Sequence, residues 1–488
     1  MISTRSRVII HLSSFLIVIY SLTLLLPMLV ALIAQEQSFF AFAGSFLIFF
    51  PAGLMCWYRS KTTGLQLQTR DGFLVIAVFW LLFSVISAMP FWLDDHLNMA
   101  FEDALFEGVS GITTTGASVF HNVTDLPRSV LYYRAQLNFI GGLGVIVLAV
   151  AIFPLLGIGG MRLYQSEMPG PFKDEKLTPR LASSARNLWF TYLLLGFCCT
   201  VAFKLAGMTW FDALCHGLST VSLGGFSTYS ESIGYFNSSA IELVAGAFSL
   251  LSAVNFTLYF VALAKRSLKP LFSNTELRFY FAVAALIIGL VFFEVWRANM
   301  YSSAEESFVH AFFLTSSMLT DNGLATGDYA QWPSHIIVLL LFASFFGGCV
   351  GSTCGGIKAI RFLILSKQSW REVYSLIHPK AQTLIKVGDT VVQHRLINSV
   401  LSFFFLYVIC TCFFIWCLNL MGYDLMTSFA SVAACINNMG LGFGLTAPGF
   451  GEISPAAKYL LCFAMLLGRL EIYTLLVLLS VSFWRNWP

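Results

Sequence analysis

Four short loops, each built around one glycine, contain the residues of this chain best suited to bind an ion. In an extended loop the backbone carbonyls can replace the hydration shell of a cation. Glycine suits such a loop because a β-carbon obstructs the backbone conformations that bring carbonyls close to an ion. One such loop alone would fit helix packing or a turn equally well. The candidate ion-binding residues are Thr114, Thr115, Gly116, Leu223, Gly224, Gly225, Asp321, Asn322, Gly323, Asn438, Met439 and Gly440.

The four loops share one register with the segments that precede them. Residues 101–110 align without a gap to residues 210–219, which places Gly116 opposite Gly225. Four loops in one register predict a selectivity filter, in which each copy of a repeat contributes one loop. The aligned positions thirteen residues before the glycines are Asp103, Asp212, His310 and Thr427, and those six residues before are Ser110, Ser219, Ser317 and Ala434.

The segment before each loop is amphipathic and short. These segments cover residues 101–114, 210–223, 306–320 and 424–437. At about 1.5 Å per residue a helix of this length reaches only about 21 Å, less than the ~30 Å hydrocarbon core of a bilayer. We therefore expect re-entrant half-helices whose C-terminal ends, which carry partial negative charge, point toward the membrane centre.

The composition is that of an integral membrane protein. Hydrophobic residues make up 57% of the 488 residues and charged residues only 11%, whereas soluble domains carry about 25% charge. A cytosolic enzyme, a nucleic-acid binder and a secreted disulfide scaffold are excluded. The 11 cysteines lie mostly in apolar runs and match no zinc spacing, so we interpret them as small buried hydrophobes.

Ten apolar stretches are long enough to cross a bilayer, and their flanking charges set the orientation. Most of the 28 Lys and Arg residues fall on one side, which predicts that this side and both termini are cytoplasmic and that the half-helices enter from outside. The basic loops at 162–186, 265–278 and 358–395 fit either a docked cytosolic partner or ordinary positive-inside bias. The predicted spans are 8–34, 38–57, 73–92, 134–160, 188–206, 239–264, 278–297, 334–366, 396–418 and 455–484, and the outer basic residues are Arg128, Arg134, Lys204, Arg297 and Lys458.

Acidic residues collect on the predicted outer side. They fit either solvated loops or a negative vestibule that concentrates cations. As a group they favour the vestibule. The residues concerned are Asp94, Asp95, Glu102, Asp103, Glu107, Asp212, Glu305, Glu306, Asp321, Asp328 and Asp424.

The repeat organises the whole chain into an all-α polytopic membrane protein. We predict ten transmembrane helices and four re-entrant pore half-helices, arranged as four span–pore helix–span repeats around one pore. Residues 1–70 form two extra helices. The repeats cover residues 71–162, 163–268, 269–380 and 381–488.

A glycine-rich segment interrupts the second span of the third repeat. Five glycines within residues 347–356 make a continuous helix costly, at about 1 kcal/mol each. We predict a broken helix whose middle lies under the filter as a gate, although close packing of small residues is an alternative. The spacing does not match a phosphate-binding Walker loop. The predicted gate residues are Gly347, Gly348, Gly351, Ser352, Gly355, Gly356, Lys358 and Arg469.

Arg469 belongs to this set because it lies deep in the last predicted span. A buried Arg costs at least about 2.5–3.5 kcal/mol at the membrane centre, so it should face protein or water. A structural pairing with Glu471 is the alternative, but residues two apart do not face each other on a helix. We expect Arg469 to contact the gate segment below the filter.

These residues resemble the Trk potassium-uptake membrane subunits of the TrkG and TrkH type, in the Trk/Ktr/HKT superfamily. The resemblance covers nearly the whole chain, and the third filter loop, 319–326, departs from the usual TrkH pattern and is closer to TrkG. It is carried by the segments Ile112–Ala117, Glu167–Pro171, Gly224–Thr228, Gly347–Thr353, Asn437–Gly440 and Gly468–Glu471.

The resemblance implies K⁺ uptake across a bacterial inner membrane, with K⁺ held at the filter residues. It also implies a homodimer with one pore per protomer, surrounded by lipid, and a cytosolic regulatory subunit of the TrkA type. ATP or NAD is expected on that partner only, and no cofactor is expected to be bound covalently here.

Two other classes of protein are alternatives. A secondary cation symporter, moving K⁺ with H⁺ or Na⁺, could use the same filter, but such folds usually contain two inverted repeats, whereas these four copies share one orientation. An intramembrane enzyme would need a Ser/His, Asp/Asp or His-Glu-x-x-His arrangement within the spans, and the sequence contains none.

Overall fold

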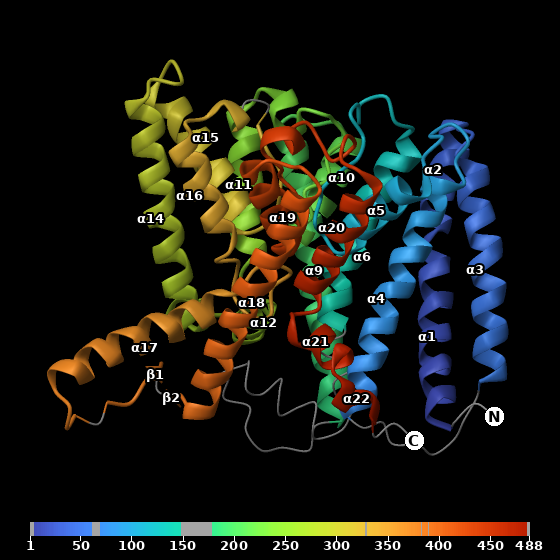
Figure 1. The fold of residues 1–488 in the computed structure, drawn as a ribbon. Helices are drawn as coiled ribbons and strands as arrows, with labels where there is room; N and C mark the ends of the chain where they lie inside the picture. Colours follow the sequence, from blue (N-terminus) through green and yellow to red (C-terminus); the bar gives the residue numbers. More distant parts are fainter. Residues whose placement is uncertain are drawn as a thin grey trace.

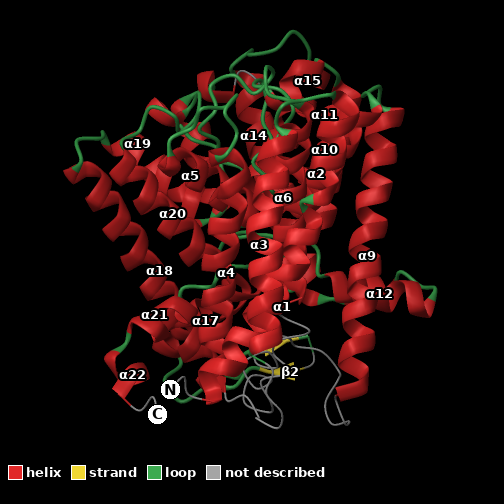
Figure 2. Cartoon of the chain, turned by 90° about the vertical axis from the view of Figure 1, so that its right-hand side faces the viewer, coloured by secondary structure: helices red, strands yellow, loops and turns green. Residues whose placement is uncertain are grey.

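The computed structural model describes residues 4–60, 69–147, 178–326, 329–381, 383–388 and 390–485, and this part of the chain is predominantly helical (Figures 1 and 2). One two-stranded hairpin, β1 (Lys386–Val387) with β2 (Thr390–Val391), lies beyond α17. The longer helices are α1 (Thr4–Thr23), α2 (Leu25–Ala34), α3 (Phe39–Arg59), α4 (Thr69–Trp92), α6 (Arg128–Val147), α9 (Thr178–Leu205), α11 (Ser239–Ser252), α12 (Phe256–Lys265), α14 (Thr275–Arg297), α16 (Ser334–Ser344), α17 (Ala359–Ile377), α18 (His394–Leu420) and α20 (Pro455–Arg469).

Four short helices occupy the predicted half-helix ranges to within a residue or two. They are α5 (Phe101–Ile112), α10 (Trp210–Ser222), α15 (Ala304–Leu319) and α19 (Leu425–Ile436). All four lie in the upper half of the bundle, opposite the end where α1 begins and α22 (Val481–Arg485) ends (Figures 1 and 2).

Local sequence explains where three of these short helices begin. A side-chain oxygen accepts a hydrogen bond from a first-turn amide at Thr209 for α10, Ser303 for α15 and Asp424 for α19. Such caps satisfy amides that have no partner within the helix. The hydrogen bonds from Thr427 hold the pKa of the Asp424 carboxyl below its ordinary value.

Six helices in the described ranges are long and apolar enough to cross a membrane, and up to eight if two sharply bent pairs each count as one span. The six are Arg7–Ala34, Phe39–Arg59, Gly72–Trp92, Arg186–Leu205, Thr275–Arg297 and His394–Leu420. The predicted span 134–160 continues past Val147 into residues outside the described part. The motif Glu167–Pro171, residues 162–177 of the basic loop 162–186 and the predicted repeat boundary at residue 162 also lie outside it, whereas the predicted boundary at residue 70 falls within α4.

Two predicted spans are bent, and their prediction as continuous helices was wrong. Between α11 and α12 the axis turns by 89°, and between α20 and α21 (Tyr473–Leu479) it turns by 114°. The Asn255 side chain accepts a hydrogen bond from the Thr257 amide and starts α12 in its new direction. At the second bend Glu471 adopts φ 50°, a left-handed conformation that ends α20.

The third repeat is interrupted where the glycine-rich segment lies. α16 ends at Ser344 and α17 begins at Ala359, so the predicted span 334–366 is not one helix. Gly347, Gly351 and Gly356 have φ between 65° and 81°, a region in which glycine has no steric penalty. We call residues 345–358 the inner segment.

The remaining described elements are short connections. They are α13 (Lys269–Ser273) and the 3₁₀ turns η2 (Ser232–Phe236), η3 (Tyr329–Gln331) and η4 (Gly444–Thr446). Two of these turns contact residues that follow the glycine loops, since the Gly234 amide of η2 donates to the Ala325 carbonyl and the Tyr329 hydroxyl of η3 donates to the Gly442 carbonyl.

Candidate ion filter and its supports

The four glycine loops close into a ring. A β-carbon added to any of the four central glycines would come closer than 3.0 Å to a carbonyl oxygen of the next loop. Gly116 faces Gly224, Gly225 faces Asn322, Gly323 faces Met439, and Gly440 faces Thr115, which returns the order to the first loop. The four glycines have φ between 74° and 84°. Backbone alone therefore fits between neighbouring loops, as a filter of carbonyls requires.

Each loop leaves its short helix in the same way. The residue before each glycine donates its amide to the carbonyl six residues before that glycine, and the residue two before each glycine is left-handed, with φ 55° to 58°. This is the Schellman pattern, here with non-glycine residues in the left-handed position. The bonds are Thr115 N to Ser110 O at 2.8 Å, Gly224 N to Ser219 O at 2.9 Å, Asn322 N to Ser317 O at 2.8 Å and Met439 N to Ala434 O at 2.8 Å.

Two of the left-handed residues, Asn438 and Leu223, contact neighbouring elements through their side chains. Asn438 Nδ2 donates to Thr115 Oγ1 at 2.9 Å and to the Met465 carbonyl at 3.0 Å. Leu223 packs in a buried apolar cluster with Leu250 and Ala253. Their side chains therefore brace the loops, while the backbone of the ring is left to contact an ion.

Asp321, the unusual residue of the third loop, is fully buried and faces the inner segment. Its Oδ2 accepts a weak hydrogen bond from Cys354 Sγ at 3.4 Å, and its Oδ1 has no hydrogen-bond partner among the described residues. The third loop is thereby coupled to the inner segment by a carboxylate that the other three loops lack.

The inner segment lies directly against the lower ends of three short helices. Thr353 Oγ1 donates to the Val221 carbonyl of α10 at 3.3 Å, and Cys354 Sγ donates to the Thr320 carbonyl after α15 at 3.0 Å. A β-carbon at Gly355 would collide with the carbonyl of Asn437, after α19. Residues 353–355 therefore contact the ends of α10, α15 and α19, next to three of the four glycine loops.

Of the other predicted gate residues, Gly348 contacts the end of α11, whereas Ser352 and Lys358 bond within the inner segment itself. Gly348 packs against the Ala253 carbonyl, and Ser352 Oγ donates to the Cys349 carbonyl at 2.7 Å. Lys358 has φ 83°, and its Nζ donates to the Cys354 carbonyl.

Arg469 contacts the inner segment, as the sequence led us to expect. Its Nη1 donates to the Thr353 carbonyl at 2.9 Å, and its Nη2 donates to the Gly141 carbonyl of α6 at 3.0 Å. Glu471, the alternative partner, forms an ion pair with Arg361 instead. Arg469 thus joins the inner segment to the first repeat, which the segment does not reach through residues 353–355.

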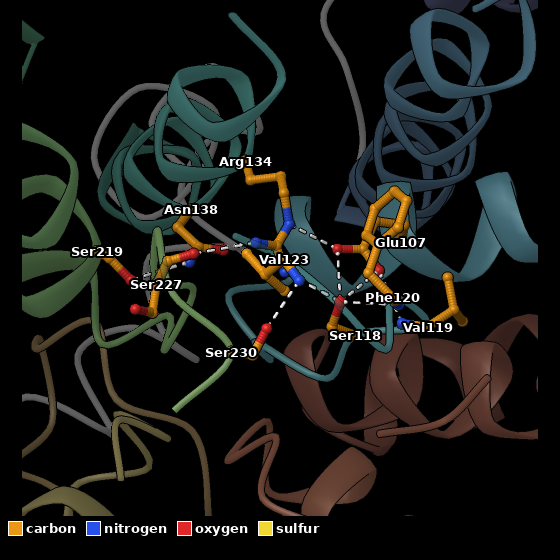
Figure 3. Close-up of polar contacts among 10 residues, drawn as sticks. All are labelled: Glu107, Ser118, Val119, Phe120, Val123, Arg134, Asn138, Ser219, Ser227 and Ser230. Atoms are coloured by element: carbon orange, nitrogen blue, oxygen red, sulfur yellow. Dashed lines mark hydrogen bonds and ion pairs between the residues drawn. The ribbon is translucent and has the colours of Figure 1, made fainter. Parts of the chain in front are cut away.

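On the side of the loops opposite the inner segment, Arg134 of α6 connects the first two loops, and the sequence analysis missed this role (Figure 3). Its Nε lies 2.7 Å from Glu107 Oε1, Nη2 donates to Ser118 Oγ at 3.0 Å, and Nη1 donates to the Ser227 carbonyl at 3.0 Å. The pair is almost fully buried, with exposed fractions of 2% for Arg134 and 0% for Glu107. Two charges of opposite sign on the same side of the membrane were the only signal in the sequence.

The acidic vestibule that we expected is largely committed to internal contacts. Glu107 pairs with Arg134, and Asp103 pairs with Lys458. Asp212 is buried and accepts hydrogen bonds from Thr209, Thr228 and Tyr229. For these three acids the contacts show a structural role, because each stabilises a short helix or a loop, and the negative vestibule that the acids suggested as a group stays a prediction.

A helical bundle of this apolar composition, with a ring of carbonyl-bearing loops at its centre, is the architecture of a membrane cation transporter. Residues 37–485 match the model of the TrkH family, described as a cation transport protein. The Trk system potassium uptake protein TrkG of Escherichia coli (strain K12) is 62% identical over 484 residues, which are 99% of this chain and 100% of that protein.

Two further comparisons agree. The Trk system potassium uptake protein TrkH of Vibrio parahaemolyticus serotype O3:K6 is 44% identical over 98% of this chain and 99% of its own. The crystal structure of the potassium transporter TrkH from Vibrio parahaemolyticus superposes with a TM-score of 0.91 and 41% identity, covering 98% of this chain and 99% of that one. The chain belongs to the TrkH family, a family of cation transport proteins and not of enzymes.

Proposed function

We propose that this protein takes up K⁺ through the ring formed by its four glycine loops. The observation that carries the proposal is the closed succession in which Gly116, Gly225, Gly323 and Gly440 each face a carbonyl of the next loop. Such a ring presents backbone oxygens from four sides, as a dehydrated cation requires. The names of the relatives, which are Trk system potassium uptake proteins, support K⁺ as the ion.

The driving force need not be ATP. A membrane potential contributes about 2.3 kcal/mol per 100 mV for each positive charge, enough for roughly 50-fold accumulation. The four short helices would strengthen this path, since each turns its partially negative C-terminal end toward the ring.

In the proposed topology ten helices span a bacterial inner membrane, four short helices re-enter it from outside, and both termini are cytoplasmic. The position of α5, α10, α15 and α19 in the half of the bundle opposite α22 supports this arrangement (Figure 1). The predominance of Lys and Arg in the predicted inner loops supports it as well.

We further propose that the inner segment is the gate. Its contacts with the carbonyls after α10, α15 and α19 support an obstruction immediately below the filter. In this proposal Arg469 is a tether, because it binds the segment at Thr353 and the first repeat at Gly141.

The proposal also includes two kinds of protein partner. We propose a homodimer with one pore per protomer and a cytosolic regulatory subunit of the TrkA type that binds ATP or NAD. The "Trk system" in the relatives' names supports a multi-component system. The exposed basic residues around Lys265, Arg266, Lys269 and Arg278 are candidates for docking that subunit.

The test is ion flux into liposomes that contain the purified protein. We expect K⁺ to enter when a membrane potential alone is imposed, and Na⁺ to enter far more slowly. In cells that lack other potassium importers, the protein should restore growth at low K⁺. Purified, folded protein that passes both ions equally would refute the filter.

A secondary symporter is the alternative, because the same ring could serve coupled transport. It differs in one measurable respect. A symporter requires a proton or Na⁺ gradient to move K⁺ against its own gradient, whereas a channel-like protein follows the K⁺ electrochemical potential. Flux with every other gradient collapsed separates the two.

A further inference from the structure

A second ring of hydrogen bonds lies just outside the filter, at the residue two positions after each central glycine. We call these residues, Ser118, Ser227, Ala325 and Gly442, the collar. The carbonyl oxygen of every collar residue accepts a hydrogen bond from another repeat. The donors are Phe450 N to Ser118 at 2.8 Å, Arg134 Nη1 to Ser227 at 3.0 Å, Gly234 N to Ala325 at 3.3 Å and Tyr329 Oη to Gly442 at 3.1 Å.

The donors follow one circular order. The first loop is held by the fourth repeat, the second loop by the first repeat, the third by the second and the fourth by the third. The glycines of the filter contact one another in the same order. The collar therefore closes around the same axis as the filter, and it fixes the end of each loop relative to its neighbour.

One collar donor is ionised. Phe450 and Gly234 donate backbone amides and Tyr329 donates a phenol, but Arg134 donates from a guanidinium. Arg134 is also the donor that reaches two collar residues, since its Nη2 binds the Ser118 side chain (Figure 3). A planar guanidinium fixes both positions at once, because its donors form a rigid fork.

The positive charge of Arg134 is neutralised by the adjacent carboxylate of Glu107. Glu107 accepts from its Nε and also from the Val119 amide at 3.0 Å, and the Phe226 ring lies 4.1 Å from the guanidinium carbon. The buried pair is formally neutral, so it places no net positive charge beside an arriving cation. The pair therefore holds the loops in position and does not attract or repel the ion.

We propose that Arg134 is a positioning residue that sets K⁺ over Na⁺ discrimination by holding the first two filter loops at a fixed separation through the collar. This inference rests on the proposed filter function. Charge-assisted hydrogen bonds are the strongest and most directional ones available at these loops. Discrimination of K⁺ from Na⁺ depends on the positions at which the filter carbonyls are held. Loss of the Arg134 hydrogen bonds should therefore lower the K⁺/Na⁺ flux ratio more than it lowers K⁺ flux itself.

The experiment measures K⁺ and Na⁺ flux separately in liposomes for Arg134→Lys and Arg134→Gln. Lys retains the charge but cannot reach Glu107, Ser118 and Ser227 together. We expect the K⁺/Na⁺ flux ratio to fall by about tenfold, equivalent to about 1.4 kcal/mol, in Arg134→Gln, and by less in Arg134→Lys. K⁺ flux itself should stay close to that of the parent protein.

Two comparison variants keep the test decisive. Arg128→Gln removes the same charge from the exposed outer end of the same helix and should leave the ratio unchanged. Tyr329→Phe removes a neutral collar donor at the fourth loop while keeping the ring, and it should lower the ratio modestly even if Arg134→Gln fails to fold. A Tyr329→Phe protein and a folded Arg134→Lys protein that both keep the parent ratio would overturn the collar.

Failure of the collar and failure of the filter give different patterns. If Gly225→Ala abolishes discrimination while the collar variants keep it, the filter stands and the collar is refuted. If Gly225→Ala also leaves the ratio unchanged, the filter itself is refuted, and the collar with it.

Discussion

Arg361 Nη2 lies 2.8 Å from Glu471 Oε2 and joins the first turn of α17 to the break between α20 and α21. The guanidinium carbon also lies 3.9 Å from the Phe403 ring centroid of α18. Arg361 therefore connects the helix that leaves the inner segment with two helices of the fourth repeat. The 114° bend at Glu471 is what brings this carboxylate to Arg361.

Glu471→Gln should destabilise the protein, because it removes the negative charge that faces the largely buried guanidinium of Arg361. The side chains are 9% exposed at Arg361 and 41% exposed at Glu471, so solvent weakens the pair, and we expect a loss of about 1 kcal/mol. Thermal unfolding in detergent measures it. Arg297→Gln breaks the exposed pair with Glu294 and should change the midpoint very little; equal shifts in both variants would contradict the prediction.

Serine at any of the four filter glycines should lower the K⁺/Na⁺ flux ratio. The added β-carbon would come closer than 3.0 Å to a neighbouring carbonyl, and each position has a positive φ that resists side chains. Gly289→Ser in α14 is the matched control, because a β-carbon there has no atom within 4 Å. Filter variants that are folded and as selective as Gly289→Ser would exclude these loops as the filter.

Shortening the inner segment should raise ion flux several-fold and reduce its dependence on the cytosolic partner. Deleting residues 351–354 removes the contacts of Thr353 and Cys354 with the ends of α10 and α15. Flux into liposomes is measured with and without the regulatory subunit. If the glycines serve only close packing, the deletion should instead lower yield and flux together, and a well-folded deletion protein with unchanged flux would rule out the gate.

Arg469→Gln should also raise flux, for two separable reasons. It removes the hydrogen bonds to the Thr353 and Gly141 carbonyls, and it removes a positive charge from a low-dielectric region near the ion path. Arg469→Lys keeps the charge but not the fork of donors. A rise in both variants identifies the tether, a rise in Arg469→Gln alone identifies the charge, and no rise in either contradicts the prediction.

Neutralising Lys265, Arg266, Lys269 and Arg278 should weaken retention of the regulatory subunit without changing the fold. Positive loops on the cytoplasmic side arise from insertion rules as well as from docking, so orientation must be checked in the same variant. Co-purification yield against the parent protein provides the measurement. If the variant is correctly oriented and still co-purifies with the full amount of regulatory subunit, these charges do not dock the subunit and serve only to set the topology.

Local patterns in the sequence were enough to locate the short helices, the glycine loops that follow them and the interruption between α16 and α17. An amphipathic segment followed by glycine encodes a helix end within a few neighbouring residues, and clustered glycines disfavour helix wherever they occur. These features depend on contacts close in the chain, which is why their bounds lie within a residue or two of the structure.

The bends and the collar depend on partners far apart in the chain. Ala253 ends α11 where its carbonyl accepts the Cys349 amide at 2.8 Å, and Glu471 meets Arg361 across two repeats. Neither break contains a glycine or a proline. Arg134 and Glu107 were visible only as two charges on the outer side, since nothing within a local window pairs them.

All four loops of the ring belong to one polypeptide chain, and this has a genetic consequence. In a pore assembled from four identical subunits, a codon change is imposed on all four sides at once. Here a change at Asp321 alters one quadrant and leaves Thr114, Leu223 and Asn438 as they were. Each quadrant can therefore be changed without the other three, and the four equivalent positions hold four different residue types.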